Sequence, residues 1–187
     1  ALNNDPATSV IVLISKPPYP EVLLKVKEEV KNCKKPVVGI FIGSDGKGLE
    51  DSGIHLVLNL EDAAKKAVEL SGNHNDVFLK SLEKAYMEIP ALALKMAKEN
   101  NGKYLRGLFS GGTLCDEAQL VLRNYTKNIY SNTPLAGLSL LENEWKSKAN
   151  TIVDLGDDKF TSGRPHPMID FSLRNKRIVE EASDPET

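Results

Sequence analysis

Apolar residues along this chain fall into short continuous runs, separated by longer stretches with helical periodicity. The runs are rich in Val, Ile and Leu, a pattern typical of strands that are buried on both faces of a parallel sheet. Such strands are expected at residues 10–14, 37–42, 55–58, 104–109 and 151–155. Since parallel neighbours require a crossover connection, this order predicts right-handed βαβ units.

The stretches between the runs place apolar residues on one helical face and Lys and Glu on the other. They predict helices over residues 21–33, 60–70 and 171–182, and one that follows the turn after residue 109 and ends at about residue 124. A further amphipathic stretch over residues 73–101, interrupted near Pro90, predicts a helical connector. The sequence therefore predicts a doubly wound, mostly parallel α/β fold of the flavodoxin-like or Rossmann-like three-layer type.

The bulk composition is that of an ordinary globular protein. Of the 187 residues, 41% are hydrophobic and 27% are charged, with a formal net charge of -2. This balance gives no electrostatic reason to expect nucleic acid or an anionic membrane as a partner. No apolar run approaches the roughly 18–20 residues that cross a bilayer. Cys33 and Cys115 lack the spacing of a metal knuckle or a disulfide framework, and no other metal ligands cluster, which predicts reduced thiols in the cytoplasm.

The most informative segment is the small-residue turn formed by Ser110, Gly111, Gly112 and Thr113, between an expected strand and an expected helix. Backbone N–H groups at a helix N-terminus have no intrahelical partner and lie at the positive end of the helix dipole. We therefore expect the turn to bind a small anion, either a phosphate or a carboxylate. The alternative is a structural turn in which glycine permits tight geometry and Thr113 serves as the N-cap. The spacing matches neither a P-loop nor the dinucleotide fingerprint.

A second candidate segment follows the last expected strand, over residues 154–170. Arg164 offers a planar cationic fork for a phosphate or carboxylate. Asp157 and its neighbour Asp158 are of the type that binds a hard cation such as Mg2+, or else form a solvated turn. His166 is a candidate for acid–base work or, held between two prolines, a structural loop residue. Because both segments follow strand ends, we expect this loop to approach the Ser110 turn.

Five segments of the chain carry a family resemblance: VIVLISKPP (10–18), KPVV (35–38), LEDAA (60–64), YLRGLFSGGTLCDEA (104–118) and TIVDLGDDKFTSGRPHPMID (151–170). Together they resemble the FdrA-type acyl-CoA synthetase-like proteins, which are relatives of the succinyl-CoA synthetase alpha subunit. The two long segments in the second half are specific, whereas KPVV is generic. The resemblance covers nearly the whole chain and is weakest over residues 73–101 and 134–148.

The resemblance implies flavodoxin-like ligase domains of the succinyl-CoA synthetase type, which use CoA and ATP in the full-length protein. In that family a turn at a helix N-terminus binds the phosphate of a catalytic phosphohistidine, and a glutamate of the following helix supports the histidine. The matching positions are Ser110, Gly111, Gly112 and Thr113 for the turn, Glu117 for the glutamate, and Gly156 and Asp157 for a second loop that borders the site. The family's Gly-His-Ala-Gly-Ala loop, expected after the strand at 37–42, has no counterpart here.

The same resemblance implies an internal piece of a longer protein that contains two related units. Residues 1–72 match the latter half of one flavodoxin-like ligase unit, residues 73–103 a helical connector, and residues 104–187 the first half of a second unit. The chain starts at Ala1 rather than Met, and its end at 184–187 echoes residues 5–8, which precede a strand. Sheet edges left open by such a division favour a homodimer or a hetero-oligomer.

Three functional hypotheses follow. The first is part of an acid–thiol ligase of the acyl-CoA synthetase type, with a phosphate or carboxylate pocket at the Ser110 turn and with Glu117 and His166 as catalytic candidates. The second, also implied by the resemblance, is a subunit of an oxamate carbamoyltransferase in anaerobic allantoin degradation, because carbamoyl phosphate and oxamate are both anions. The third is a non-catalytic anion-binding or assembly module.

Overall fold

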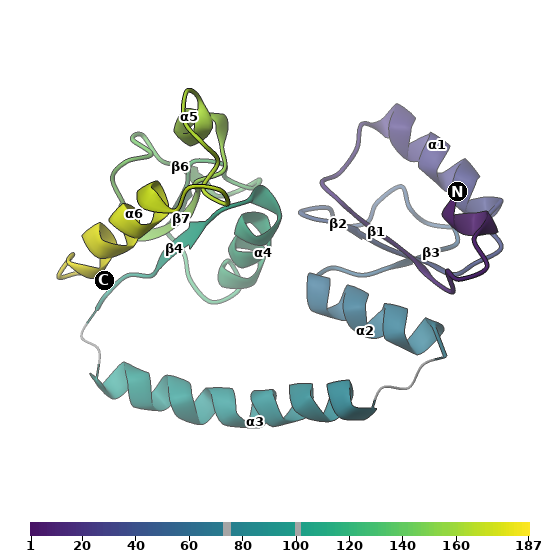
Figure 1. The fold of residues 1–187 in the computed structure, drawn as a ribbon, viewed down its shortest axis with the longest axis horizontal. Coiled ribbons are helices and arrows are strands. Elements are labelled where there is room, and N and C mark those ends of the chain that lie inside the picture. The colour runs from purple at the N-terminus through teal and green to yellow at the C-terminus, as the bar shows by residue number, and fades with distance from the viewer. Residues whose placement is uncertain (73–75, 100–101) are drawn as a thin grey trace. The chain divides into compact units, whose positions relative to one another are not determined.

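The computed structural model describes residues 1–72, 76–99 and 102–187 (Figure 1). The chain forms two compact units, Ala1–Met87 and Glu88–Thr187, and helix α3 (Asp76–Glu99) contains the boundary between them. In the described ranges, no helix is both long enough and apolar enough to cross a membrane.

The first unit contains a three-stranded parallel sheet in the order β1–β2–β3. Its strands are β1 (Ile11–Ser15), β2 (Val37–Phe41) and β3 (Ile54–Leu56). A short 3-10 helix (Leu2–Asn4) precedes the sheet, α1 (Pro20–Lys31) joins the first two strands, and α2 (Leu60–Leu70) follows the third. Every residue of β2 is buried because this strand has a neighbour on each side, which accounts for its continuous apolar run.

Both long helices of this unit begin where local chemistry favours a start. Pro20 occupies the first position of α1, where its missing N–H costs nothing. The Asn59 side chain accepts a hydrogen bond from the N–H of Asp62 and thereby caps α2. The bounds predicted for the helix over residues 60–70 are confirmed.

The second unit contains a four-stranded parallel sheet in the order β4–β7–β5–β6. Its strands are β4 (Arg106–Phe109), β5 (Ile129–Ser131), β6 (Ser139–Leu140) and β7 (Asn150–Asp154). Helix α4 (Gly112–Leu122) follows β4, whereas the short α5 (Asp158–Thr161) and then α6 (Ser172–Ala182) follow β7.

Apolar side chains form two separate clusters on the two faces of this sheet. One cluster joins Cys115 of α4 to Ile152 of β7, and the other joins Leu173 of α6 and Phe160 of α5 to Val153 of β7. Adjacent residues of a strand point to opposite faces, so Ile152 and Val153 place α4 and α6 on opposite sides of the sheet (Figure 1). The predicted three-layer, mostly parallel α/β fold is confirmed.

Two strands were not predicted, and one local prediction is wrong. The stretch after α4 contains β5 and β6, which are too short to produce a hydrophobic period. Helix α3 also continues through Pro90 without interruption, because a proline removes a single N–H donor and the flanking Ala, Leu and Lys residues favour helix. The ends of the predicted connector, at 73–75 and 100–101, lie outside the described residues.

A buried ion-pair network fastens α6 to the rest of the second unit. The Glu181 carboxylate accepts hydrogen bonds from Arg177 at 2.6 Å, from Arg106 at 3.0 Å and from the Ser147 hydroxyl at 2.6 Å. Arg106 also pairs with Asp184 at 2.9 Å. The two arginine side chains are at most 5% exposed, so both guanidinium groups depend on a neighbouring carboxylate for their charge balance.

We predict that Glu181→Gln lowers the free energy of unfolding by about 3 kcal/mol, because it leaves buried cationic groups without their shared carboxylate. Urea denaturation monitored by circular dichroism measures this loss. The matched control is Glu142→Gln, an exposed glutamate of the same unit that lies 3.7 Å from Lys148, which should change stability by no more than about 0.5 kcal/mol. Equal effects of the two variants would contradict the role given to the network.

Candidate functional site at the carboxyl ends of β4 and β7

The Ser110 turn joins the carboxyl end of β4 directly to α4. Gly111 is the N-cap of α4 and has no side chain with which to accept a bond from the first N–H groups of the helix. Thr113 lies inside the first turn and is exposed, so the alternative in which it serves as the N-cap is wrong. The first backbone N–H groups of α4 are therefore not capped by a side chain of the N-cap residue. They also lie at the positive end of the helix dipole.

A cavity of about 340 Å3 lies against this turn. Beside the backbone and small side chains of the turn, its walls include three apolar side chains: Phe109 of β4, Leu114 of α4 and Met168 from the loop before α6. None of the three was predicted from the sequence. Phe109 and Leu114 flank the turn and could have been proposed from their positions, whereas Met168 reaches the cavity from more than fifty residues away.

The carboxyl end of β7 is bound by the Asn132 side chain, which forms the two backbone hydrogen bonds that a neighbouring strand would otherwise form. The Asn132 amide donates to the carbonyl of Asp154 at 3.0 Å and accepts from its N–H at 2.9 Å. The Asp154 carboxylate then accepts the N–H of Gly156 at 2.8 Å, which turns the chain sharply after the strand. Gly156 is thereby fixed next to the Ser110 turn: a Cβ atom built on it would lie 3.2 Å from the Ser110 carbonyl oxygen.

His166 lies at the same place. The Cβ position of Gly156 is 2.8 Å from His166 Nε2, so the absence of a side chain on Gly156 gives the imidazole its space. His166 Nδ1 accepts the N–H of Met168 at 3.2 Å, so in the neutral ring the proton is on Nε2. The structure therefore brings together Ser110, Gly156 and His166, three of the residues predicted from the sequence.

The other predicted residues have different positions. Asp157 is the N-cap of α5, where its carboxylate accepts the N–H of Lys159 at 3.1 Å. Arg164 lies over the ring of Trp145, 5.5 Å from its centroid, and does not line the cavity at the turn. Glu117 is half-buried in the second turn of α4, beyond the N–H groups at the helix start.

The acidic and thiol groups near the site do not form a metal centre. Within the described ranges, no group of three or more His, Cys, Asp or Glu side chains is placed to hold a metal ion. Cys115 is fully buried in the first turns of α4, and this burial, with a smaller effect of the Asp154 carboxylate, raises the pKa of its thiol to about 12.

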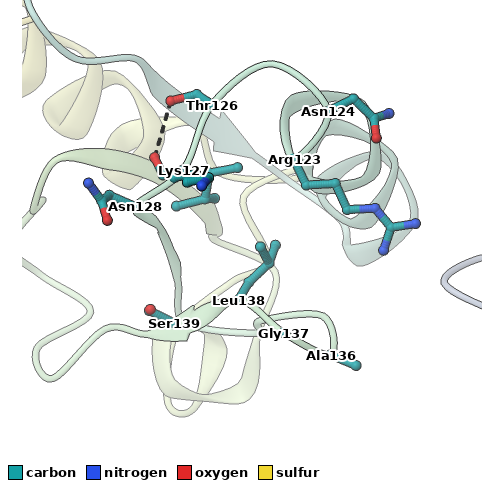
Figure 2. A pocket seen from close by; sticks show the side chains of 10 residues that line it. Arg123, Asn124, Thr126, Lys127, Asn128, Ala136, Gly137, Leu138 and Ser139 are labelled. Atoms are coloured by element: carbon teal, nitrogen blue, oxygen red, sulfur yellow. Dashed lines mark hydrogen bonds between the residues drawn. The ribbon is translucent and has the colours of Figure 1, made fainter.

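A larger cavity, of about 540 Å3, lies away from the turn (Figure 2). It is lined by residues 123–124 and 126–129, from the end of α4 to the start of β5, and by residues 136–139, which lead into β6. Helix α4 runs from the Ser110 turn to Arg123, a length of about 16 Å for its residues. This cavity therefore lies at the opposite end of α4 and contains none of the predicted site residues.

Comparison with known proteins bears on the half of the chain that holds this site. Residues 108–187 match the CoA-ligase family model. This range contains the Ser110 turn, Gly156 and His166. The chain as a whole is similar to the uncharacterized protein YahF of Escherichia coli (strain K12), with 41% identity over 186 residues, which cover 99% of this chain and 35% of YahF. The CoA-ligase part of the resemblance is thus confirmed for residues 108–187.

We predict that Gly156→Ala displaces His166 and destabilises the protein by about 1–3 kcal/mol, since the new methyl group would lie 2.8 Å from Nε2 and 3.1 Å from an Asp154 carboxylate oxygen. The matched control is Gly111→Ala, whose Cβ meets no atom within 4 Å and whose backbone is extended. Thermal denaturation measures stability, and the His166 ring signals in NMR report its displacement. Unchanged ring signals in Gly156→Ala would contradict the placement of His166.

We also predict that Cys115 does not react with a thiol reagent in the folded protein at pH 8, because the pKa of its thiol is about 12 and no solvent reaches it. Of the two cysteines in the chain, only the half-buried Cys33 should react under native conditions, and both should react in denaturant. Titration with a chromogenic disulfide measures the number of reactive thiols in the native protein and in denaturant. Reaction of both thiols in the native protein would show that Cys115 is accessible.

Proposed function

We propose that this chain is part of an acyl-CoA synthetase-like acid–thiol ligase, in which the Ser110 turn binds a phosphate or carboxylate group. The position of the turn carries the proposal, since it lies inside the CoA-ligase match and next to Gly156 and His166. Its N-cap also caps no N–H group. Following the resemblance, we further propose that the units are the latter and opening halves of two ligase domains of the FdrA type.

Three groups of this chain would act on the bound anion. The backbone N–H groups of the first turn of α4 would hold its oxygens, as at other helix N-termini. His166 would donate a hydrogen bond or a proton to the anion from its Nε2–H, because its Nδ1 accepts the N–H of Met168. Glu117 would support the charge of a histidine or its substrate from the second turn of α4.

CoA and ATP are the cofactors proposed for the whole protein. The cavity at the turn, about 340 Å3, is at the small end of the range of about 300–1,000 Å3 typical of ligand sites. It suits a phosphate or a short carboxylic acid better than a nucleotide, and Phe109, Leu114 and Met168 would contact the apolar part of such an acid. Bound ATP would supply the phosphoryl group that activates the acid.

A second candidate function is carbamoyl transfer to oxamate, as one subunit of an oxamate carbamoyltransferase. The favouring observation is the segment after β2, residues 42–53, which contains no histidine and so lacks the phosphohistidine of the ligase relay. Carbamoyl phosphate needs no such relay, and its phosphate could occupy the same turn. A non-catalytic anion-binding module is the third candidate and shares only the binding step.

We predict that inorganic phosphate stabilises the chain against heat, by about 2–4 °C for each kcal/mol of binding energy that it contributes. Gly112→Asp should abolish this shift, because a carboxylate at the first position of α4 is favourable for the helix and repels an anion there. Asn128→Asp, which adds the same charge at the opposite end of α4, should retain it. An unchanged melting temperature of the unmodified chain at millimolar phosphate would contradict the proposed anion site.

The full-length protein separates the candidate functions. Formation of a CoA thioester from ATP and an acid, with loss of activity in His166→Asn, supports the ligase. Consumption of carbamoyl phosphate only when oxamate is present supports the transferase. Phosphate binding with neither activity supports the binding module.

A further inference from the structure

A further cavity of the second unit, of about 360 Å3, lies between the loop before β7, the loop after α5, and α6. Trp145 comes from the first of these loops, Arg164 and Asp170 from the second, and Lys176 from α6. Only Arg164 was singled out from the sequence. None of these residues lines the cavity at the Ser110 turn.

The cavity has an excess of positive charge that the protein leaves available. It holds two cationic side chains, Arg164 and Lys176, against a single carboxylate, Asp170. That carboxylate is already engaged, since it accepts the N–H of Ser172 at 2.9 Å. Across the described part of the chain, no carboxylate forms an ion pair with Arg164, and Lys176 has only an exposed contact of 3.7 Å with Glu180.

One of the cationic groups lies over an aromatic ring. The Arg164 guanidinium lies 5.5 Å from the centroid of the Trp145 ring, and that ring in turn packs edge-to-face on the buried Phe160, with centroids 4.8 Å apart. A guanidinium over an aromatic ring is attracted to it by a cation–π interaction, and its N–H donors can form paired bonds to a phosphate.

We propose that Trp145, Arg164 and Lys176 form a binding site for a phosphate monoester, distinct from the anion site at the Ser110 turn. Arg164 binds the phosphate through two parallel N–H groups, and Lys176 adds a second positive charge. The cavity is larger than a phosphate group, so the ligand carries an organic part that lies against the edge of Trp145. The site does not depend on the proposed ligase or transferase activity, because it shares no residue with the turn.

The ligand can be tested directly because Trp145 is the only tryptophan in the chain. The chain is titrated with AMP, ribose 5-phosphate and inorganic phosphate while tryptophan emission is recorded with excitation at 295 nm. A saturable change with both esters supports recognition through the phosphate and sugar, and a change with AMP alone places the base in the cavity. A response to neither ester, or to inorganic phosphate alone, overturns the proposal.

Variants assign the response to the cavity. Arg164→Gln and Lys176→Gln should each weaken ester binding by at least about tenfold, the value of one charge-assisted contact. Arg123→Gln is the matched control, because it removes an exposed arginine of the same unit from the cavity shown in Figure 2. Circular dichroism confirms folding of each variant before titration. Affinity unchanged in both cavity variants, or reduced equally in Arg123→Gln, contradicts the site.

Discussion

The candidate site depends on the two hydrogen bonds that join the Asn132 side chain to the backbone of Asp154. The last backbone pair between β5 and β7 is Ser131 with Ile152, and the amide of Asn132 continues this pairing past the end of β5. Both residues are buried, so water does not compete for these bonds. Gly156, α5 and the loop with His166 all follow this fixed point. The N–H of Leu155, which donates to the Phe109 carbonyl at 2.7 Å, joins the same point to the strand before the Ser110 turn.

The carboxylates around the site already accept hydrogen bonds from backbone N–H groups. For this reason an anion fits there better than a metal ion. Asp154 accepts the N–H of Gly156, and Asp157 accepts the N–H of Lys159. The N–H donors at the start of α4, in contrast, have no N-cap side chain to which they can donate, because the N-cap is a glycine. An oxygen-rich ligand complements such a place, whereas a cation would have to compete with two N–H groups for its oxygens.

Much of this arrangement follows from the sequence, and the rest from contacts between distant residues. The continuous apolar run at residues 37–42 was sufficient to predict a buried strand, and a small-residue turn after a strand predicted a helix N-terminus with unpaired N–H groups. Asn132 could not be recognised, because its role appears only when residue 154, on another strand, lies opposite it. Arg164 was expected near the turn, but the chain bends at Arg164, so His166 lies against Gly156 whereas Arg164 lies over Trp145.

The loop after α5 therefore belongs to two cavities at once. Met168 forms a wall at the Ser110 turn, whereas Arg164 and Asp170 line the cavity of Trp145. The segment between them is short and internally braced, since the carbonyl of His166 accepts the N–H groups of both residue 169 and residue 170. The two cavities therefore share one short segment, and any effect that a ligand in one cavity had on binding in the other would, by thermodynamic reciprocity, be equal in both directions.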